Sequence, residues 1–157
     1  MGRSKAGFEF YDPGELVDGE LEVVLYHTMH GDPARKRLPS YTFGMLVDGK
    51  PVGGLTLRIG YTELISRYSG HIGYRVAPEH RGHHYAERSC RLLLPLFKAH
   101  GIDPVWITCN PDNIPSRRTC ERLGAVLVEI VDVPEDNEHY KRGDTRMCRY
   151  RIDLNLC

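Results

Sequence analysis

Residues 70–86 read GHIGYRVAPEHRGHHYA, and this stretch decides the fold. Its first half is short and rich in β-forming residues, which predicts a strand over Gly70 to Val76 that Pro78 ends. A short loop with Arg81 and Gly82 follows, and then apolar residues return at helical spacing. The sequence therefore predicts a strand, a loop and the N-terminus of a helix in direct succession.

The helix is predicted over Tyr85 to His100, with Gly101 as the residue that stops it. Pro95 lies inside this range, so we expect the helix to kink or break there. The β-forming run Val105 to Cys109 then predicts a buried strand. A strand–helix–strand passage of this length fits a right-handed crossover, which places the two strands side by side and parallel.

Further strands flank this unit, and Asp48-Gly49 marks a hairpin turn between two of them. A second helix is predicted over Ile114 to Leu123, and residues 1–20 form an irregular lead-in. We expect one α/β (α+β) domain over residues 1–157, with a mixed, mostly antiparallel sheet, a central parallel strand pair and flanking helices. The other predicted strands are Leu21 to Tyr26, Tyr41 to Val47, Val52 to Ile59, Ala125 to Val133 and Arg146 to Ile152, the last two separated by a polar loop over Pro134 to Asp144.

The composition is that of an ordinary globular protein, with 41% hydrophobic and 27% charged residues. Lys+Arg and Asp+Glu balance at 21 each, so no bulk attraction to nucleic acid or to an anionic membrane is predicted. No apolar run approaches the ~20 residues of a membrane span, and residues 1–10 lack the apolar core of a secretory signal. The five cysteines are odd in number and form no CxxC pair, which argues against a disulfide framework or a zinc site and favours a cytoplasmic location.

The loop before the predicted helix is the first functional signal. The N–H groups at a helix N-terminus have no partner within the helix, and the helix dipole favours negative charge there. Such a turn binds phosphate or pyrophosphate, and Arg81 adds a charge-assisted contact. The residues alone leave two interpretations open, a phosphate site and a plain solvated connection.

Together with VWITCNPDNIPSRRTCERLGA at residues 105–125, this stretch resembles the GNAT acetyltransferase superfamily, and most of all its small, mostly uncharacterised bacterial members. The strong resemblance covers residues 70–125, and the order of the other strands agrees with it. It implies a GNAT-like fold in which the parallel strands splay apart and admit the pantetheine arm of acetyl-CoA. It also implies an N-acetyltransferase that moves the acetyl group from acetyl-CoA to a primary amine by direct attack, without a metal.

The resemblance further implies which residues bind acetyl-CoA. In the family an R-x-x-G-x-A loop binds the CoA pyrophosphate, and here that loop begins at Arg81 and ends at Ala86. The family's pantetheine amides pair with the backbone of the preceding strand, and an asparagine begins the next helix. The expected cofactor-binding residues are Tyr74, Val76, Arg81, Gly82, His83, His84, Tyr85, Ala86, Asn113 and Ser116.

His84 stands where the family has the inner glycine of this loop. Glycine lets the backbone approach phosphate closely, whereas a Cβ atom crowds that approach. Either the loop opens slightly, or the imidazole itself contacts the phosphate.

Two residues are candidates for catalysis, and each has a structural alternative. The family often uses a helix tyrosine to protonate the CoA thiolate, and Cys120 occupies that position here. A thiol with a pKa of about 8.5 donates a proton; the alternative is a small buried thiol that packs the helix, with Ser116, Tyr140 or water as the acid.

For the general base we select His71, because it lies on the strand whose end meets the thioester and titrates in the useful range. The alternative is a histidine held by hydrogen bonds within the strand.

The remaining basic clusters are assigned no separate site. His80, His83 and His84 have no acidic or thiol partner at ligand spacing, so no metal is predicted. Arg117-Arg118 is typical of a solvated helix face, with contact to the 3′-phosphate of CoA as the alternative.

The acceptor is expected to be a small-molecule or peptide amine. The chain is short around Arg35 to Arg37, where the family usually has two helices, so that wall of the site is open or comes from a second subunit of a homodimer. The rival function is a non-catalytic acyl-CoA-binding or sensing module. A nucleic-acid-binding domain is disfavoured because the chain has neither net positive charge nor a basic aromatic stripe.

Overall fold

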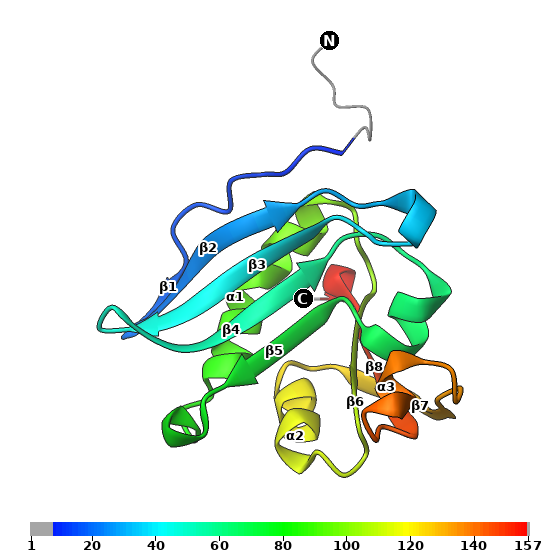
Figure 1. Ribbon diagram of the computed structural model, residues 1–157. Coiled ribbons are helices and arrows are strands. Elements are labelled where there is room, and N and C mark those ends of the chain that lie inside the picture. Colours follow the sequence, from blue (N-terminus) through cyan, green and yellow to red (C-terminus); the bar gives the residue numbers. More distant parts are fainter. Residues whose placement is uncertain (1–7, 157) are drawn as a thin grey trace.

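The computed structural model describes residues 8–156, which form two sheets with helices packed on them (Figure 1). In the larger sheet the strands lie in chain order, and each pairs antiparallel with the next: β1 (Val17–Asp18), β2 (Leu21–Met29), β3 (Ser40–Val47), β4 (Lys50–Arg58) and β5 (Ile72–Val76). The smaller sheet has β8 in the middle and is also antiparallel: β6 (Val105–Cys109), β8 (Arg146–Ile152) and β7 (Val126–Asp132).

Three α-helices occur in the described residues: α1 (Tyr85–Ala99), α2 (Ile114–Arg122) and α3 (Glu138–Lys141). Figure 1 shows α1 crossing behind the larger sheet, while α2 and α3 lie beside the smaller one. Short helical turns occur at η1 (Pro33–Arg35), η2 (Ile65–Ser69), η3 (Pro78–His80) and η4 (Leu154–Leu156). Within this part of the chain, no helix has the length and apolar character needed to cross a membrane.

The face of α1 that points into the core explains why the helix is continuous. Leu93, Leu96 and Phe97 are buried on both sides of Pro95. The prediction that the helix breaks at Pro95 is wrong, because α1 runs from Tyr85 to Ala99 without interruption; the alternative, a kink at Pro95, stays a prediction. A proline removes one backbone hydrogen bond, and the burial of its apolar neighbours, at about 1.5–3 kcal/mol for each side chain, compensates for that loss.

One hydrophobic cluster joins the two sheets and α1. Tyr41 and Phe43 enter it from β3, Phe97 from α1, and Ile107 and Tyr150 from the smaller sheet, all with at most 1% of their surface exposed. Apolar side chains that alternate along the strands supply this core. The core therefore fixes the smaller sheet against the larger one.

The predicted elements are largely confirmed, and the differences lie at their ends and in the segments predicted to be irregular. The predicted strands Val105–Cys109 and Arg146–Ile152 are β6 and β8 without change. The polar loop between the last two strands contains α3, because Asn137 caps that helix through its Oδ1 atom, which accepts from the His139 N–H at 2.8 Å. The first seven residues of the expected lead-in lie outside the described residues, and its last part forms β1.

The two sheets meet where β5 begins. The backbone N–H of His71 donates to the carbonyl oxygen of Trp106 at 2.7 Å. Gly70, at φ 74°, makes this approach possible, since a Cβ atom there would lie 3.1 Å from the same oxygen. Beyond this point β5 and β6 diverge (Figure 1), and the strand pairings of the described residues include no ladder between them.

The side chain of His71 strengthens this junction. It is fully buried; Nδ1 accepts from the Trp106 N–H at 2.9 Å, so the proton lies on Nε2, which donates to the Gly60 oxygen at 2.8 Å. Burial, with a smaller effect from the positive charge of Arg58, lowers the pKa of His71 from 6.5 to about 4. The ring is therefore a neutral structural bridge.

This low pKa predicts a loss of stability in acid. Between pH 6.5 and about pH 4 the unfolded chain binds a proton at His71 and the folded chain does not, so the free energy of unfolding should fall by about 3 kcal/mol on acidification through that range. Urea unfolding of the wild type and His71→Asn at about pH 7 and about pH 4.5 measures this contribution. The variant should be less stable at neutral pH but lose less stability in acid. An equal loss in both proteins would contradict the assignment.

Candidate functional site

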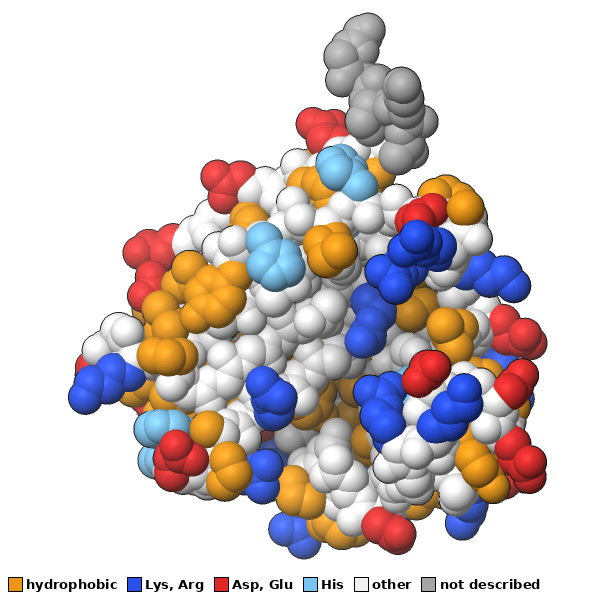
Figure 2. All heavy atoms as spheres, viewed as in Figure 1, with side chains coloured by type: hydrophobic (Ala, Val, Ile, Leu, Met, Phe, Trp, Pro, Cys, Tyr) orange, Lys and Arg blue, Asp and Glu red, His pale blue; other side chains and the backbone are white. Residues whose placement is uncertain are grey.

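A cavity of about 560 Å³ opens between the C-terminal end of β5, the loop before α1 and the first turn of α2. In Figure 2 several Lys and Arg side chains stand along the lower edge of the molecule, where these segments meet. All predicted cofactor-binding residues except His83 line the cavity. The other residues that line it are Arg75, His80, Ile114, Pro115, Arg118, Thr119 and Arg122. The structure thus brings together residues that lie far apart in the sequence.

The loop before α1 presents the start of that helix to the cavity. η3 follows β5, Gly82 has φ 96°, and His84 is the N-cap residue of α1. The His84 side chain makes no capping hydrogen bond, and the next two residues, Tyr85 and Ala86, line the cavity. Backbone N–H groups in this first turn have no acceptor within the helix. They are suited to bind an anion at the positive end of the helix dipole.

His84 adopts the left-handed conformation, with φ 60° and ψ 29°. This is the conformation that glycine adopts most easily, and a residue with a Cβ atom pays about 1–2 kcal/mol for it. The loop therefore keeps the backbone path of a glycine although a histidine occupies the position. The half-exposed imidazole contacts Glu87, with Nδ1 3.9 Å from its carboxylate.

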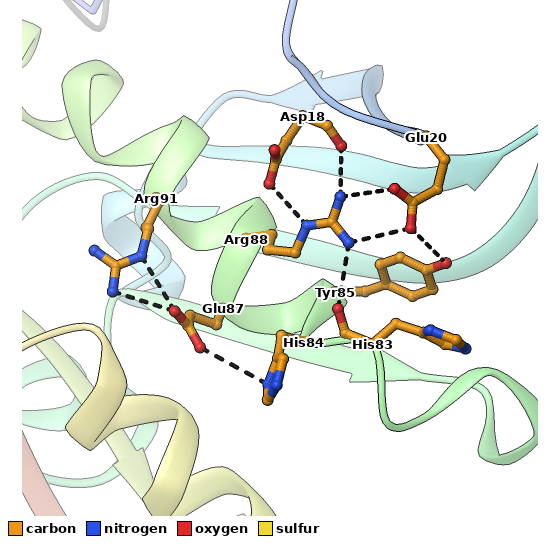
Figure 3. A network of polar contacts seen from close by, with 8 residues as sticks. All are labelled: Asp18, Glu20, His83, His84, Tyr85, Glu87, Arg88 and Arg91. Carbon is orange, nitrogen blue, oxygen red and sulfur yellow. Dashed lines mark hydrogen bonds and ion pairs between the residues drawn. The ribbon is translucent and has the colours of Figure 1, made fainter.

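A network of polar contacts holds this loop from behind (Figure 3). The guanidinium of Arg88 contacts the Asp18 carboxylate at 2.7 Å, the Glu20 carboxylate at 3.0 Å and the carbonyl oxygen of His83 at 3.3 Å. Arg88 lowers the pKa of the Glu20 carboxyl to about 2, so this carboxylate remains charged at neutral pH. The hairpin between β1 and β2 thereby fixes the start of α1. The His83 ring stacks on Tyr85, with ring centroids 5.1 Å apart, and does not line the cavity.

The charged side chains that line the cavity are the arginines Arg75, Arg81, Arg118 and Arg122. No Asp or Glu is among the described residues around it. Arg81 is exposed, and its Nε donates to the Val76 oxygen at 3.3 Å, which leaves the other guanidinium nitrogens to meet a ligand. Four guanidinium groups and a helix N-terminus fit a ligand with several phosphate charges.

The other side of the cavity is the first turn of α2. Asn113 caps this helix, and its Oδ1 accepts from the Ser116 N–H at 3.2 Å. The hydroxyl oxygen of Ser116 lies 2.7 Å from the Tyr74 hydroxyl oxygen of β5. Both side chains line the cavity, so a hydrogen-bonded pair of hydroxyl groups lies in its wall.

The two predicted catalytic residues lie outside this lining. Cys120 is fully buried in α2, and its hydrogen bond with Cys109, together with burial, raises the pKa of its thiol far above the usual value. His71 lies in the sheet junction with both ring nitrogens already bonded to the backbone. Of the two interpretations given for each residue, this geometry favours the structural one.

Sequence reasoning missed two of the arginines, Arg75 and Arg122. Alternation along β5 gave no signal for Arg75, because it places the side chains of Tyr74 and Val76 on one face of the strand and that of Arg75 on the other. Arg122 ends α2 and reaches the cavity only because α2 packs against α1. Arg118 lines the cavity, whereas its neighbour Arg117 bonds the Tyr150 hydroxyl at 3.1 Å. Among the residues described, no group of three or more His, Cys, Asp or Glu side chains is placed to hold a metal ion.

Solved structures with the same architecture include several acetyltransferases. The ribosomal L7/L12 alpha-N-protein acetyltransferase RimL, in complex with coenzyme A, is 14% identical with a TM-score of 0.64, over 88% of this chain and 97% of that chain. The ribosomal-protein-S5-alanine acetyltransferase from Vibrio fischeri is 18% identical with a TM-score of 0.58, over 73% and 61%. The microcin C7 self-immunity acetyltransferase MccE, in complex with acetyl-CoA and AMP, is 18% identical with a TM-score of 0.57, over 73% and 61%. These identities are low, so the likeness shows the fold.

Sequence comparison identifies the family. No curated protein matches the chain significantly. The model of the Acetyltransferase (GNAT) family matches residues 10–125, which is more than half of the 157 residues. The chain therefore belongs to the GNAT acetyltransferase family, and it is an acetyl-CoA-dependent acyltransferase.

Proposed function

We propose that the protein transfers the acetyl group of acetyl-CoA directly to the amine of an acceptor, and that the cavity beside β5 binds acetyl-CoA. The observation that carries this proposal is the composition of the cavity: a helix N-terminus and four arginine side chains, with no carboxylate among the described lining residues. Acetyl-CoA carries a pyrophosphate and a 3′-phosphate, which need this concentration of positive charge.

Each part of the cavity is suited to bind a different part of acetyl-CoA. The N–H groups at the start of α1 and the Arg81 guanidinium would hold the pyrophosphate. Arg118 on α2 would meet the 3′-phosphate, and Arg122, whose Nε lies 4.0 Å from the Glu87 carboxylate, would add a second positive charge. The backbone of Tyr74 and Val76 would pair with the pantetheine amides, because β5 has no strand partner on its β6 side beyond the junction at His71.

The bound co-substrate supplies an activated acetyl group and a thiol leaving group. The protein's task is to bind it, orient it and supply a proton to the departing sulfur. We propose Ser116 for this proton, since its hydroxyl lines the cavity, whereas Cys120 is fully buried outside the lining and Tyr140 packs against Val131 and Met147. We propose a structural role for His71, since neither ring nitrogen is free to accept a proton from an amine.

The acceptor class follows from the chemistry of direct transfer, which requires a neutral primary amine. RimL and the Vibrio fischeri structure are named as ribosomal-protein acetyltransferases. We therefore propose peptide N-termini as the first acceptors to screen, together with small amines. The rival function, acyl-CoA binding without turnover, would show binding but no release of free CoA with any member of that panel.

The first prediction concerns binding at the arginine-lined cavity. Titration calorimetry should give a dissociation constant for acetyl-CoA in the micromolar range, and Arg81→Ala should weaken it by about tenfold, the cost of a charged hydrogen bond. Arg35→Ala is the matched control, since its side chain is 72% exposed and Arg35 does not line the cavity. ADP measures the contribution of the phosphates alone. Unchanged affinity for acetyl-CoA in Arg81→Ala would show that the loop is not part of the acetyl-CoA site.

The second prediction concerns the conformation of His84. His84→Gly should raise the free energy of unfolding by about 1 kcal/mol, because glycine adopts the left-handed conformation without strain. Affinity for acetyl-CoA should stay the same or increase. The control Gly82→Ala should lower the free energy of unfolding. No atom lies within 4 Å of the added Cβ, so the effect comes from the backbone, whose φ of 96° strains any residue with a side chain. Chemical unfolding and calorimetry measure both quantities. Weaker binding in His84→Gly would instead show that the imidazole contacts the phosphate.

A further inference from the structure

The hydrogen bond between Tyr74 and Ser116 connects the two walls of the cavity. Tyr74 lies on β5 and Ser116 on the first turn of α2, and their hydroxyl oxygens are 2.7 Å apart. The Tyr74 hydroxyl also lies 3.4 Å from the backbone oxygen of Ser116. Ser116 is held from a second direction by Asn113, which accepts from its backbone N–H. The serine is therefore fixed on both sides.

The chemistry of the two hydroxyl groups decides which one donates. A phenol is a stronger hydrogen-bond donor than an aliphatic alcohol, because its pKa is about 10. The Tyr74 proton has two acceptors within reach, the hydroxyl and the backbone oxygen of the same serine. When Tyr74 donates, the Ser116 proton goes to another acceptor: the Cys109 sulfur, with which the serine side chain hydrogen-bonds, or the CoA sulfur when CoA is bound. Burial raises the pKa of Tyr74 above its usual value, which keeps the phenol protonated.

We propose that Tyr74 is a positioning residue for Ser116: its O–H donates to the serine oxygen and directs the serine proton toward the place where the CoA sulfur departs. This inference rests on the proposed function. As the acceptor nitrogen bonds to the acetyl carbon, the C–S bond breaks; the sulfur keeps the electron pair and takes the Ser116 proton, and the proton released by the amine passes to water. The Tyr74 O–H stabilises the negative charge left on the serine oxygen until water returns a proton.

The arrangement also accounts for the residue at position 120. A cysteine stands in α2 where the resemblance places a tyrosine, and its thiol is fully buried. A tyrosine hydroxyl nevertheless contacts α2, because Tyr74 extends from β5 to the first turn of that helix. The phenol that the helix lacks is thus supplied by the neighbouring strand.

The test measures the pKa of the CoA thiol bound to the protein, which requires no acceptor. The ultraviolet absorbance of the thiolate is followed against pH, with the S-methyl thioether of CoA as the blank for the protein's own thiols and phenols. A serine O–H directed at the sulfur stabilises the thiolate. Tyr74→Phe and Ser116→Ala should each raise the thiol pKa by up to about one unit, the value of one hydrogen bond. The double variant should show no further increase.

Two controls separate this role from simple packing. Tyr61→Phe removes a hydroxyl that donates to the Pro104 oxygen and does not line the cavity, and it should leave the thiol pKa unchanged. Ser116→Thr keeps the hydroxyl and should retain the wild-type value only while Tyr74 is present. An unchanged thiol pKa in Tyr74→Phe, or additive effects in the double variant, would overturn the inference. Failure of the wild type to bind CoA in calorimetry would instead refute the proposed function.

Discussion

The architecture depends on the junction that His71 forms between the two sheets. Its backbone N–H and Nδ1 both bond Trp106 of β6, and its Nε2 bonds Gly60 in the connection after β4. In the described part of the chain, these bonds tie β6 to the start of β5, and no ladder continues between the two strands. A full ladder between β5 and β6 would occupy the backbone groups that now face the cavity. The cavity exists because the hydrogen bonding of the sheet stops where it does.

The elements were predictable because their signals are local. Gly101 follows the end of α1, Asn113 caps the start of α2, and Pro115 lies in the first turn of α2. The β-forming run of β6 has the bounds that its composition indicates. The role of His71 was not predictable in this way. Its ring nitrogens bond residues 11 and 35 positions away in the sequence, so a strand pattern reveals its place but not whether its lone pair is free. Cys120 is similar, since only the packed helix shows that the thiol is buried outside the cavity lining.

The loop before α1 shows how a departure from a family pattern is accommodated. The expected difficulty at His84 was a Cβ atom close to phosphate, and the backbone there adopts the left-handed conformation nonetheless. The conformation is stabilised from outside the loop, where Arg88 contacts Asp18, Glu20 and the His83 carbonyl. The contact between Arg88 and Asp18 joins residues 70 positions apart in the sequence. It helps to stabilise a local backbone conformation that costs about 1–2 kcal/mol. This support could not be inferred from the loop sequence alone.

The arginine lining of the cavity has a consequence for selectivity inside a cell. Guanidinium groups recognise phosphate oxygens, and nucleotides such as ATP present the same groups as CoA. Under the proposed function, the arginines would provide affinity without discrimination between these molecules. Discrimination would then depend on the space between the diverging strands, where a long, uncharged arm would bind and a nucleotide without such an arm would make no contact. The rate of acetyl transfer would follow the ratio of acetyl-CoA to competing nucleotides, and the geometry of an interrupted sheet, rather than its charge, would determine which of them is productive.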